Sequence, residues 1–204
     1  MRHGERFNTA SHLLGLAVSA AGSAVLLPWA FQHADATAFL GIALFASATL
    51  LLYASSIAFH STHGRARAIL ERLDHGAIFV LIAGSYTPFA LASPRHGVHL
   101  GLLARLWLAA LAIAGRALAR PAAPDLRNYV VLGWLAVAAA IPVALRAGTG
   151  AITLLLLGAL VYSGGTLFYR NRMGWRHAHG CWHLCVLGGT AAHFAAVSHL
   201  VKMP

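Results

Sequence analysis

The chain has 204 residues, of which 59% are hydrophobic and only 10% are charged, and its mean hydropathy is +0.70. These values exclude an ordinary soluble domain and are typical of a polytopic membrane protein. The formal net charge of +10 raises the question of nucleic-acid binding. The basic residues, however, gather in the connections between apolar stretches, which is a signal of membrane topology, so we expect no nucleic-acid partner.

Seven apolar stretches of 19 to 23 residues follow one another along the chain. Each is long enough, as a helix, to cross a hydrocarbon core of about 30 Å. The stretches are Leu13–Phe31, Ala38–His60, His75–Ser93, Leu100–Leu118, Asn128–Arg146, Ala151–Tyr169 and His179–Val201. The seven stretches predict an all-α fold. Because the connections between them are short and leave no room for a soluble domain, we expect one seven-helix transmembrane domain over residues 1–204.

The first stretch has a rival interpretation as a cleavable signal peptide, because small residues run from Ser19 to Ala24. The apolar run continues to Phe31, which is longer than the hydrophobic region of a signal peptide. We therefore expect a retained span.

The Lys and Arg residues are distributed unequally between the two sides of the predicted bundle. Eleven lie at the N-terminus or after spans 2, 4 and 6: Arg2, Arg6, Arg65, Arg67, Arg72, Arg116, Arg120, Arg127, Arg170, Arg172 and Arg176. Four lie on the other side: Arg95, Arg105, Arg146 and Lys202. The positive-inside rule then predicts a cytoplasmic N-terminus and an outside C-terminus.

The last span opens with His179-Gly180-Cys181-Trp182-His183. Two imidazoles four residues apart lie on one face of a helix, about one turn from each other, and can reach a single metal ion. Cys181 and Cys185 are the only cysteines and form no disulfide framework. Neither shares the histidine face, since an offset of two residues rotates a side chain by about 200°.

Connectivity identifies further residues on the same side of the membrane. His60 ends span 2, Asp74 directly precedes span 3 and His179 begins span 7. With seven crossings, these three helix ends must lie on one side, which the charge bias makes cytoplasmic. Ser56 lies one turn deeper than His60 on the same helical face, and His183 lies about 6 Å deeper than His179.

This set of side chains suggests a hydrolytic metal site near the inner leaflet. Three neutral histidines, His60, His179 and His183, suit Zn²⁺ with its fourth position open to water. A zinc-bound water can lose a proton near neutral pH and attack a carbonyl. As candidate catalytic residues, Asp74 would accept that proton or hold the water, and Ser56 would bond the carboxylate or stabilise an oxyanion.

Each candidate also has a simpler structural explanation. The paired histidines of span 7 could be solvated at the headgroups, and His60 could belong with His63 to a polar loop. Asp74 is well placed to cap the N-terminus of span 3. Ser56 could bond back to a carbonyl of its own helix. Topology by itself does not establish that spans 2, 3 and 7 touch.

Seven motifs point together to one family. They are Glu5-x2-Asn8-x3-His12-x2-Gly15, Ser56-x3-His60, Leu73-Asp74-His75, Ile82-Ala83-Gly84-Ser85-Tyr86-Thr87-Pro88, Gly133-Trp134, Tyr162-x2-Gly165-x2-Phe168-Tyr169 and His179-x3-His183-Leu184, with His193 beyond. With these motifs in this order, the sequence resembles the bacterial hemolysin III family. That family lies within the wider progestin and adipoQ receptor group, which includes the adiponectin receptors.

The resemblance implies a seven-helix protein of the bacterial cytoplasmic membrane with a zinc site at His60, His179 and His183. It also implies that Asp74 holds or activates a metal-bound water, with Ser56 beside it. The eukaryotic relatives are linked to ceramide hydrolysis, so membrane lipids and a lipid amide or fatty acid are the ligands that it suggests.

Other residues of these motifs fall outside the proposed ligand set. His193 lies about 15 Å beyond His183 along the helix, too far to bind the same ion, and is expected to be a buried polar partner or to line a cavity. Glu5 and His12 approach the inner face and are either outer partners of the site or solvated surface groups.

Three functions stay open at this point. The first is a zinc-dependent hydrolase of ceramide-like lipid amides. The second is a non-enzymatic membrane-homeostasis or receptor-like protein with structural zinc, although the short loops offer no large soluble segment for signalling. A pore-forming cytolysin comes last, because no continuous polar stripe runs through several spans. The sequence predicts neither the substrate nor the oligomeric state.

Overall fold

A computed structural model describes residues 5–93, 96–119 and 125–202, and within these ranges the fold is entirely helical, without a strand. The helices are α1 (Glu5–His33), α2 (Ala36–Ser61), α3 (Arg65–Leu91), α4 (His96–Ala119), α5 (Leu126–Arg146), α6 (Thr149–Arg170), α7 (Ala178–Ser198) and a short 3₁₀ turn, η1 (Leu200–Lys202). The predicted all-α class is confirmed, and each predicted span coincides with one helix.

Within the described part of the chain, six helices are long and apolar enough to cross a membrane: α1, α2, α4, α5, α6 and α7. The remaining helix, α3, is not among them, and its first ten residues, from Arg65 to Asp74, include five charged side chains. It packs against α2, α4, α5 and α7, so that protein covers much of its surface. A helix sheltered in this way can carry polar groups that lipid would not tolerate.

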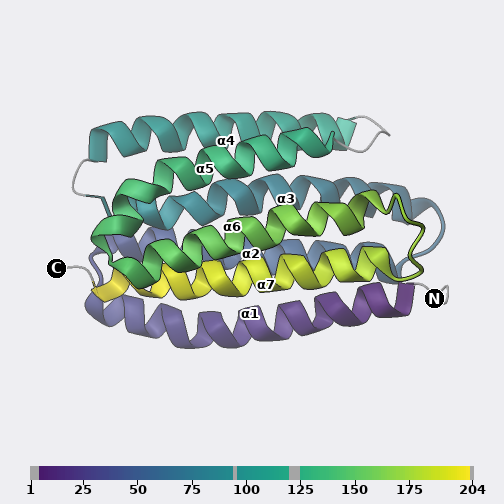
Figure 1. The fold of residues 1–204 in the computed structure, drawn as a ribbon, viewed down its shortest axis with the longest axis horizontal. Helices are drawn as coiled ribbons and strands as arrows, with labels where there is room; N and C mark the ends of the chain where they lie inside the picture. Colours follow the sequence, from purple (N-terminus) through teal and green to yellow (C-terminus); the bar gives the residue numbers. More distant parts are fainter. Residues whose placement is uncertain (1–4, 94–95, 120–124, 203–204) are drawn as a thin grey trace.

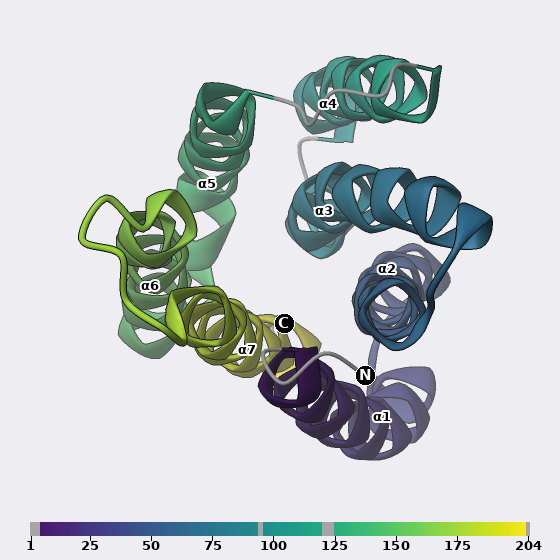
Figure 2. The same ribbon diagram turned by 90° about the vertical axis from the view of Figure 1, so that its right-hand side faces the viewer.

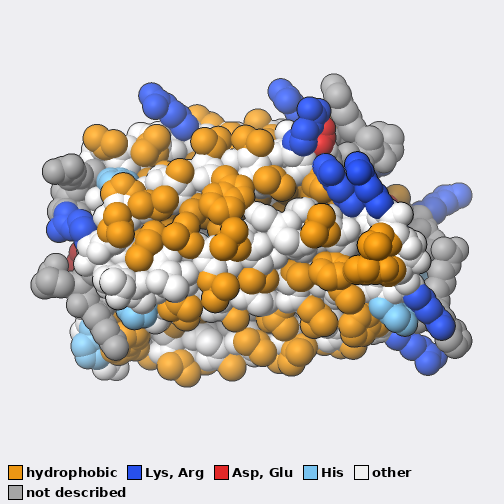
Figure 3. Space-filling model, in the orientation of Figure 1, with side chains coloured by type: hydrophobic (Ala, Val, Ile, Leu, Met, Phe, Trp, Pro, Cys, Tyr) orange, Lys and Arg blue, Asp and Glu red, His pale blue; other side chains and the backbone are white. Residues whose placement is uncertain are grey.

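Large hydrophobic side chains cover the outside of the bundle. Val25, Leu108 and Leu167 are among the most exposed. On the face shown in Figure 3, hydrophobic side chains occupy the middle, and Lys and Arg lie toward the ends. An apolar belt between charged ends is the surface that a bilayer requires. The protein is therefore a helical membrane protein.

Six helices enclose the interior, and one lies outside. Viewed along the bundle, α1, α2, α3, α5, α6 and α7 form a ring, while α4 lies against the outer side of α3 (Figure 2). In Figure 1 the starts of α1, α3 and α7 and the end of α2 gather at the same end of the molecule. The end of α2 and the starts of α3 and α7 therefore lie at the same end of the bundle, as the connectivity predicted.

Helix α3 begins earlier than the apolar pattern indicated. Its first residue is Arg65, ten residues before His75, and its N-cap is Gly64 with φ 74°. Arg, Ala, Leu and Glu favour helix, so the charged segment extends the span without a break. Asp74 lies inside the helix and is buried. The explanation of Asp74 as an N-cap is therefore wrong.

Two close helix contacts hold the start of α1 over the ends of its neighbours. A Cβ at Gly15 would lie within 2.6 Å of the Tyr53 ring on α2, and a Cβ at Gly180 on α7 would overlap the Phe7 ring. Small residues at these two positions let α1 approach both helices. As a result, the first two turns of α1 form one wall of the site described next.

Candidate metal centre

Three histidines from two helices meet at the end of the bundle where α2 ends and α7 begins. One ring nitrogen of each of His60, His179 and His183 lies within 4.8 Å of the other two. The ring centroids are 4.5 Å apart for His179 and His183, and 4.9 Å apart for His60 and His183. His60 and His183 are 2% exposed, and His179 is half-buried. The structure thus brings the three predicted ligands together.

The His60 ring is oriented by a carboxylate from α1. Its Nδ1 lies 2.6 Å from Oε2 of Glu5, whose other oxygen accepts a 2.7 Å bond from Arg67 Nη2 on α3. An ionised carboxylate only accepts hydrogen bonds, so Nδ1 of His60 must be the donor. The lone pair of a neutral imidazole is then on Nε2, which is buried and has no partner in the described part of the chain. Metal-binding histidines commonly have such a carboxylate partner.

The His183 ring is also oriented through its Nδ1 atom, by residues of the next turn of α1. Its Nδ1 lies 3.2 Å from the Asn8 carbonyl oxygen and 3.1 Å from Ser11 Oγ. Ser11 itself donates to the Asn8 carbonyl over 2.8 Å. Since a carbonyl can only accept, Nδ1 of His183 carries the proton and Nε2 has the lone pair. Both buried histidines are therefore fixed in the tautomer that suits a metal ligand.

Asp74 and Ser56 line the same cavity as the histidines, which encloses about 490 Å³. The Ser56 hydroxyl oxygen is buried next to the Asp74 carboxyl, and it makes no bond to a carbonyl of the described residues. On the same helix, Thr49 and Ser55 do bond back to carbonyls. The explanation that Ser56 merely bonds to its own helix is therefore wrong, and its hydroxyl lies instead beside Asp74 in the wall of the cavity.

His12 of α1 forms another part of the cavity wall. Its ring centroid lies 3.7 Å from that of His183, and both of its nitrogens are buried with no hydrogen bond to any described residue. An unpartnered buried polar group costs about 1–3 kcal/mol, so several of them in one cavity indicate a place built for a polar ligand. Of the two interpretations of His12, the structure favours a place in the site over solvation at the surface.

The side chains present fit a divalent metal ion. The cluster offers three imidazoles, two with their Nε2 lone pairs left free by the bonds at Nδ1, beside a polar cavity. Imidazole ligands suit zinc and other late first-row metals. Cys185 takes no part, because its side chain faces Gly165 on α6. The three close histidines could therefore hold a metal ion.

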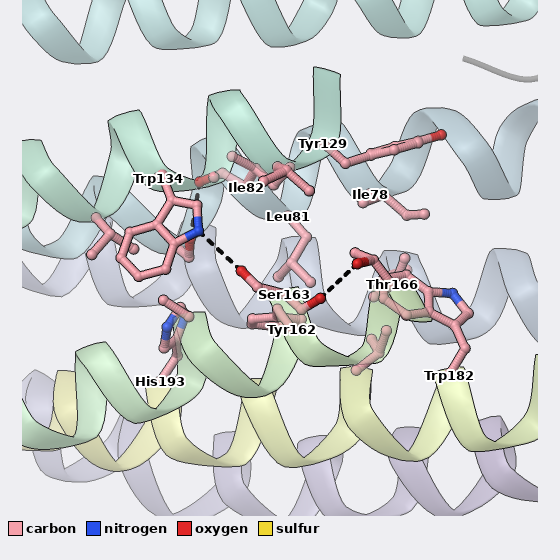
Figure 4. A pocket seen from close by; sticks show the side chains of 17 residues that line it. Ile78, Leu81, Ile82, Tyr129, Trp134, Tyr162, Ser163, Thr166, Trp182 and His193 are labelled. Atoms are coloured by element: carbon pink, nitrogen blue, oxygen red, sulfur yellow. Dashed lines mark hydrogen bonds between the residues drawn. The ribbon is translucent and has the colours of Figure 1, made fainter. Parts of the chain in front are cut away.

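A second, apolar pocket of about 90 Å³ adjoins the polar cavity and extends between α3, α5, α6 and α7 (Figure 4). The two share four lining residues: Leu52, Ile78, Trp182 and Val186. His193 lies on the apolar pocket and bonds the Leu155 carbonyl through Nε2 over 3.2 Å. As expected from its spacing, His193 is outside the histidine cluster and is a buried polar partner.

Sequence reasoning missed Asn8, Ser11 and Arg67 as partners of the site. Asn8 and Ser11 hold His183, and Arg67 holds Glu5. A signal was present, because Glu5, Asn8 and His12 are spaced three and four residues apart and so share one helical face. Arg67 carried no such signal, since the sequence explains it equally well as one of the basic residues in the predicted connection after span 2.

A bundle of apolar helices with a buried three-histidine cluster at one end defines a helical membrane protein with a candidate metal centre. The family model described as "Haemolysin-III related" matches residues 1–194. The chain is 36% identical to "Hemolysin-3 homolog" of Bacillus subtilis (strain 168), over 97% of this chain and 94% of that protein. It is 34% identical to "Hemolysin-3" of Bacillus cereus, over 93% and 88%. The chain belongs to the haemolysin-III related family.

We predict that loss of any one histidine of the cluster abolishes stable metal binding. Protein purified without chelators should contain stoichiometric divalent metal, and His60→Ala, His179→Ala and His183→Ala should each reduce it to near zero by mass spectrometry. His63→Ala, at an exposed position outside the cluster, is the control and should retain the metal. Unchanged metal in His60→Ala would show that α2 and α7 do not share an ion.

Proposed function

We propose that this protein is a zinc-dependent hydrolase of long-chain lipid amides, with its site near the cytoplasmic leaflet of the bacterial inner membrane. One observation carries the proposal. The polar cavity that holds the three histidines, Asp74 and Ser56 shares a wall with an apolar pocket among the helices. A polar reaction site joined to a hydrocarbon-like pocket fits an amphipathic substrate.

The chain's own residues have separate roles in this proposal. His60, His179 and His183 hold the ion, and Glu5, Asn8 and Ser11 keep two of the rings in place. Zinc with an open fourth position acidifies water and polarises a carbonyl. Asp74 accepts the proton of the attacking water and returns it to the leaving amine. The Ser56 hydroxyl orients the Asp74 carboxyl or donates to the developing oxyanion.

The two cavities position the substrate. The first carbons of the hydrocarbon chain lie in the apolar pocket, where burial of each CH₂ group contributes about 0.8 kcal/mol. The amide then falls at the boundary formed by Leu52, Ile78, Trp182 and Val186, beside the polar cavity. Binding energy from the chain thus holds the scissile bond near the groups that react.

We predict that Asp74→Asn lowers the turnover of a long-chain amide by about 10²–10⁴-fold, because it removes the proton acceptor. Ser56→Ala should lower turnover less, by about 10-fold to 10²-fold, for a hydroxyl that assists rather than accepts. Metal content should stay at the wild-type level in both variants, since neither residue belongs to the histidine cluster. Product release in proteoliposomes, followed by mass spectrometry, is the measurement.

The same variants distinguish the alternative of a structural metal. If the metal only stabilises the bundle, Asp74→Asn and Ser56→Ala leave cellular function intact, while His183→Ala unfolds the protein. Absence of turnover by metal-loaded wild type across a broad panel of lipid amides and esters would reject the hydrolase proposal.

The proposed orientation has seven crossings, with the N-terminus in the cytoplasm. Its support is the excess of Arg at one end of the bundle and the full-length course of α3 through it (Figure 1). We predict that alkaline phosphatase fused at the C-terminus is active in cells, while the same reporter placed after Arg172 is inactive. Inactive phosphatase at the C-terminus would indicate six crossings or the reverse orientation.

A further inference from the structure

Tyr129 is a buried tyrosine whose hydroxyl has no partner among the residues that the structure describes. The side chain is 8% exposed, and its ring stacks on Phe79 of α3 with centroids 4.4 Å apart and planes 18° apart. Its hydroxyl oxygen is buried and makes no hydrogen bond. By contrast, the hydroxyl of Tyr53 bonds Thr190, and that of Tyr86 bonds His99. The stack fixes the Tyr129 ring, so its hydroxyl cannot swing to a distant acceptor.

The hydroxyl groups on the wall of the apolar pocket sharpen this contrast. Ser85 and Thr166 donate to helix carbonyls, Ser163 accepts from Trp134, and Tyr162 bonds Thr190. Tyr129 lines the same pocket. Among the hydroxyls on this wall, it is the one whose oxygen is buried without a partner. It is therefore the hydroxyl on this wall that has no hydrogen bond with the described part of the protein.

The position of Tyr129 identifies which part of a ligand it would meet. In Figure 4 its ring runs along the upper wall, with the hydroxyl toward the end of the pocket where Trp182 lies. Trp182 lines both cavities, and it marks the end of the apolar pocket that adjoins the polar cavity. The hydroxyl is thus directed toward the junction between the apolar pocket and the polar cavity.

We propose that Tyr129 is a substrate-recognition residue that donates a hydrogen bond to the carbonyl oxygen of a long-chain amide whose chain fills the apolar pocket. A phenol is a good hydrogen-bond donor. When a hydrocarbon chain occupies the apolar pocket, the carbonyl group at its head lies where the two cavities meet and can accept this bond. This inference rests on the proposed function for the class of ligand. It adds specificity for a chain with a polar head over a plain hydrocarbon.

The test compares two identical substitutions, Tyr129→Phe and Tyr86→Phe, in full-length metal-loaded protein in lipid nanodiscs. The ligand is a long-chain ketone, which presents the carbonyl but has no bond to hydrolyse, and a plain alkane of equal length is the reference. Because Trp134 and Trp182 line the pocket, intrinsic tryptophan fluorescence reports binding.

Tyr129→Phe should weaken ketone binding by about tenfold, the loss expected for one buried hydrogen bond. It should leave alkane binding unchanged. Without ligand, its midpoint of thermal unfolding should equal or exceed that of wild type, because no internal bond is lost. Tyr86→Phe should lower that midpoint and leave ketone affinity unchanged, because Tyr86 bonds His99 and lines neither cavity.

Equal ketone affinity in Tyr129→Phe and wild type would overturn the inference, as would failure of wild type to bind the ketone. A lower unfolding midpoint of ligand-free Tyr129→Phe would also overturn it, by showing a structural role. Wild type that binds the ketone through Tyr129 but hydrolyses no amide would refute the hydrolase and leave the recognition role standing.

Discussion

The carboxylate of Glu5, held between His60 and Arg67, is the interaction on which the rest of the site depends. It joins the start of α1 to the end of α2 and the start of α3, with contacts of 2.6 and 2.7 Å. Arg67 balances its charge, while Glu5 fixes the proton of His60 on Nδ1 and leaves Nε2 for a metal. Such a partly buried pair is valuable for the geometry that it imposes more than for net stability. Because the glycine contacts at Tyr53 and Phe7 seat the same turns of α1, the helix that fixes His60 also fixes His183.

The second organising feature is the contact between two cavities of opposite character. The polar cavity lies where α3 still carries charged residues, and the apolar pocket lies farther along the same helix, beside Leu81 and Ile82. Trp182, one residue before the candidate ligand His183, lines both cavities. This arrangement places the change from polar to apolar lining next to the candidate metal centre, along the helix that the bundle shelters from lipid. The polar cavity and the apolar pocket are thus adjoining parts of one interior.

Much of this site followed from the sequence, because helix periodicity and connectivity are strong constraints in a membrane protein. The spacing of His179 and His183 placed them on one face, and the connectivity of the spans placed His60 and Asp74 at the same end. The sequence did not show that α2 and α7 come within ligand distance, since that depends on the packing of α1 between them. Asp74 was misplaced at a helix start because the charged residues before it interrupt the apolar pattern without interrupting the helix. The partners of His183 were missed because one of them is a backbone carbonyl, which has no signature in the sequence. Tyr129 was missed for a related reason, since an unpartnered hydroxyl is visible only once its neighbours are known.

The most direct test of this account is X-ray absorption spectroscopy of the bound metal in purified wild-type protein. Three histidines and an oxygen predict only nitrogen and oxygen neighbours, at about 2.0–2.1 Å, with the outer scattering of imidazole rings. A sulfur neighbour at about 2.3 Å would place the metal on Cys181 or Cys185, and a shell without imidazole scattering would place it away from the histidines. Either result would contradict a three-histidine centre with one open position.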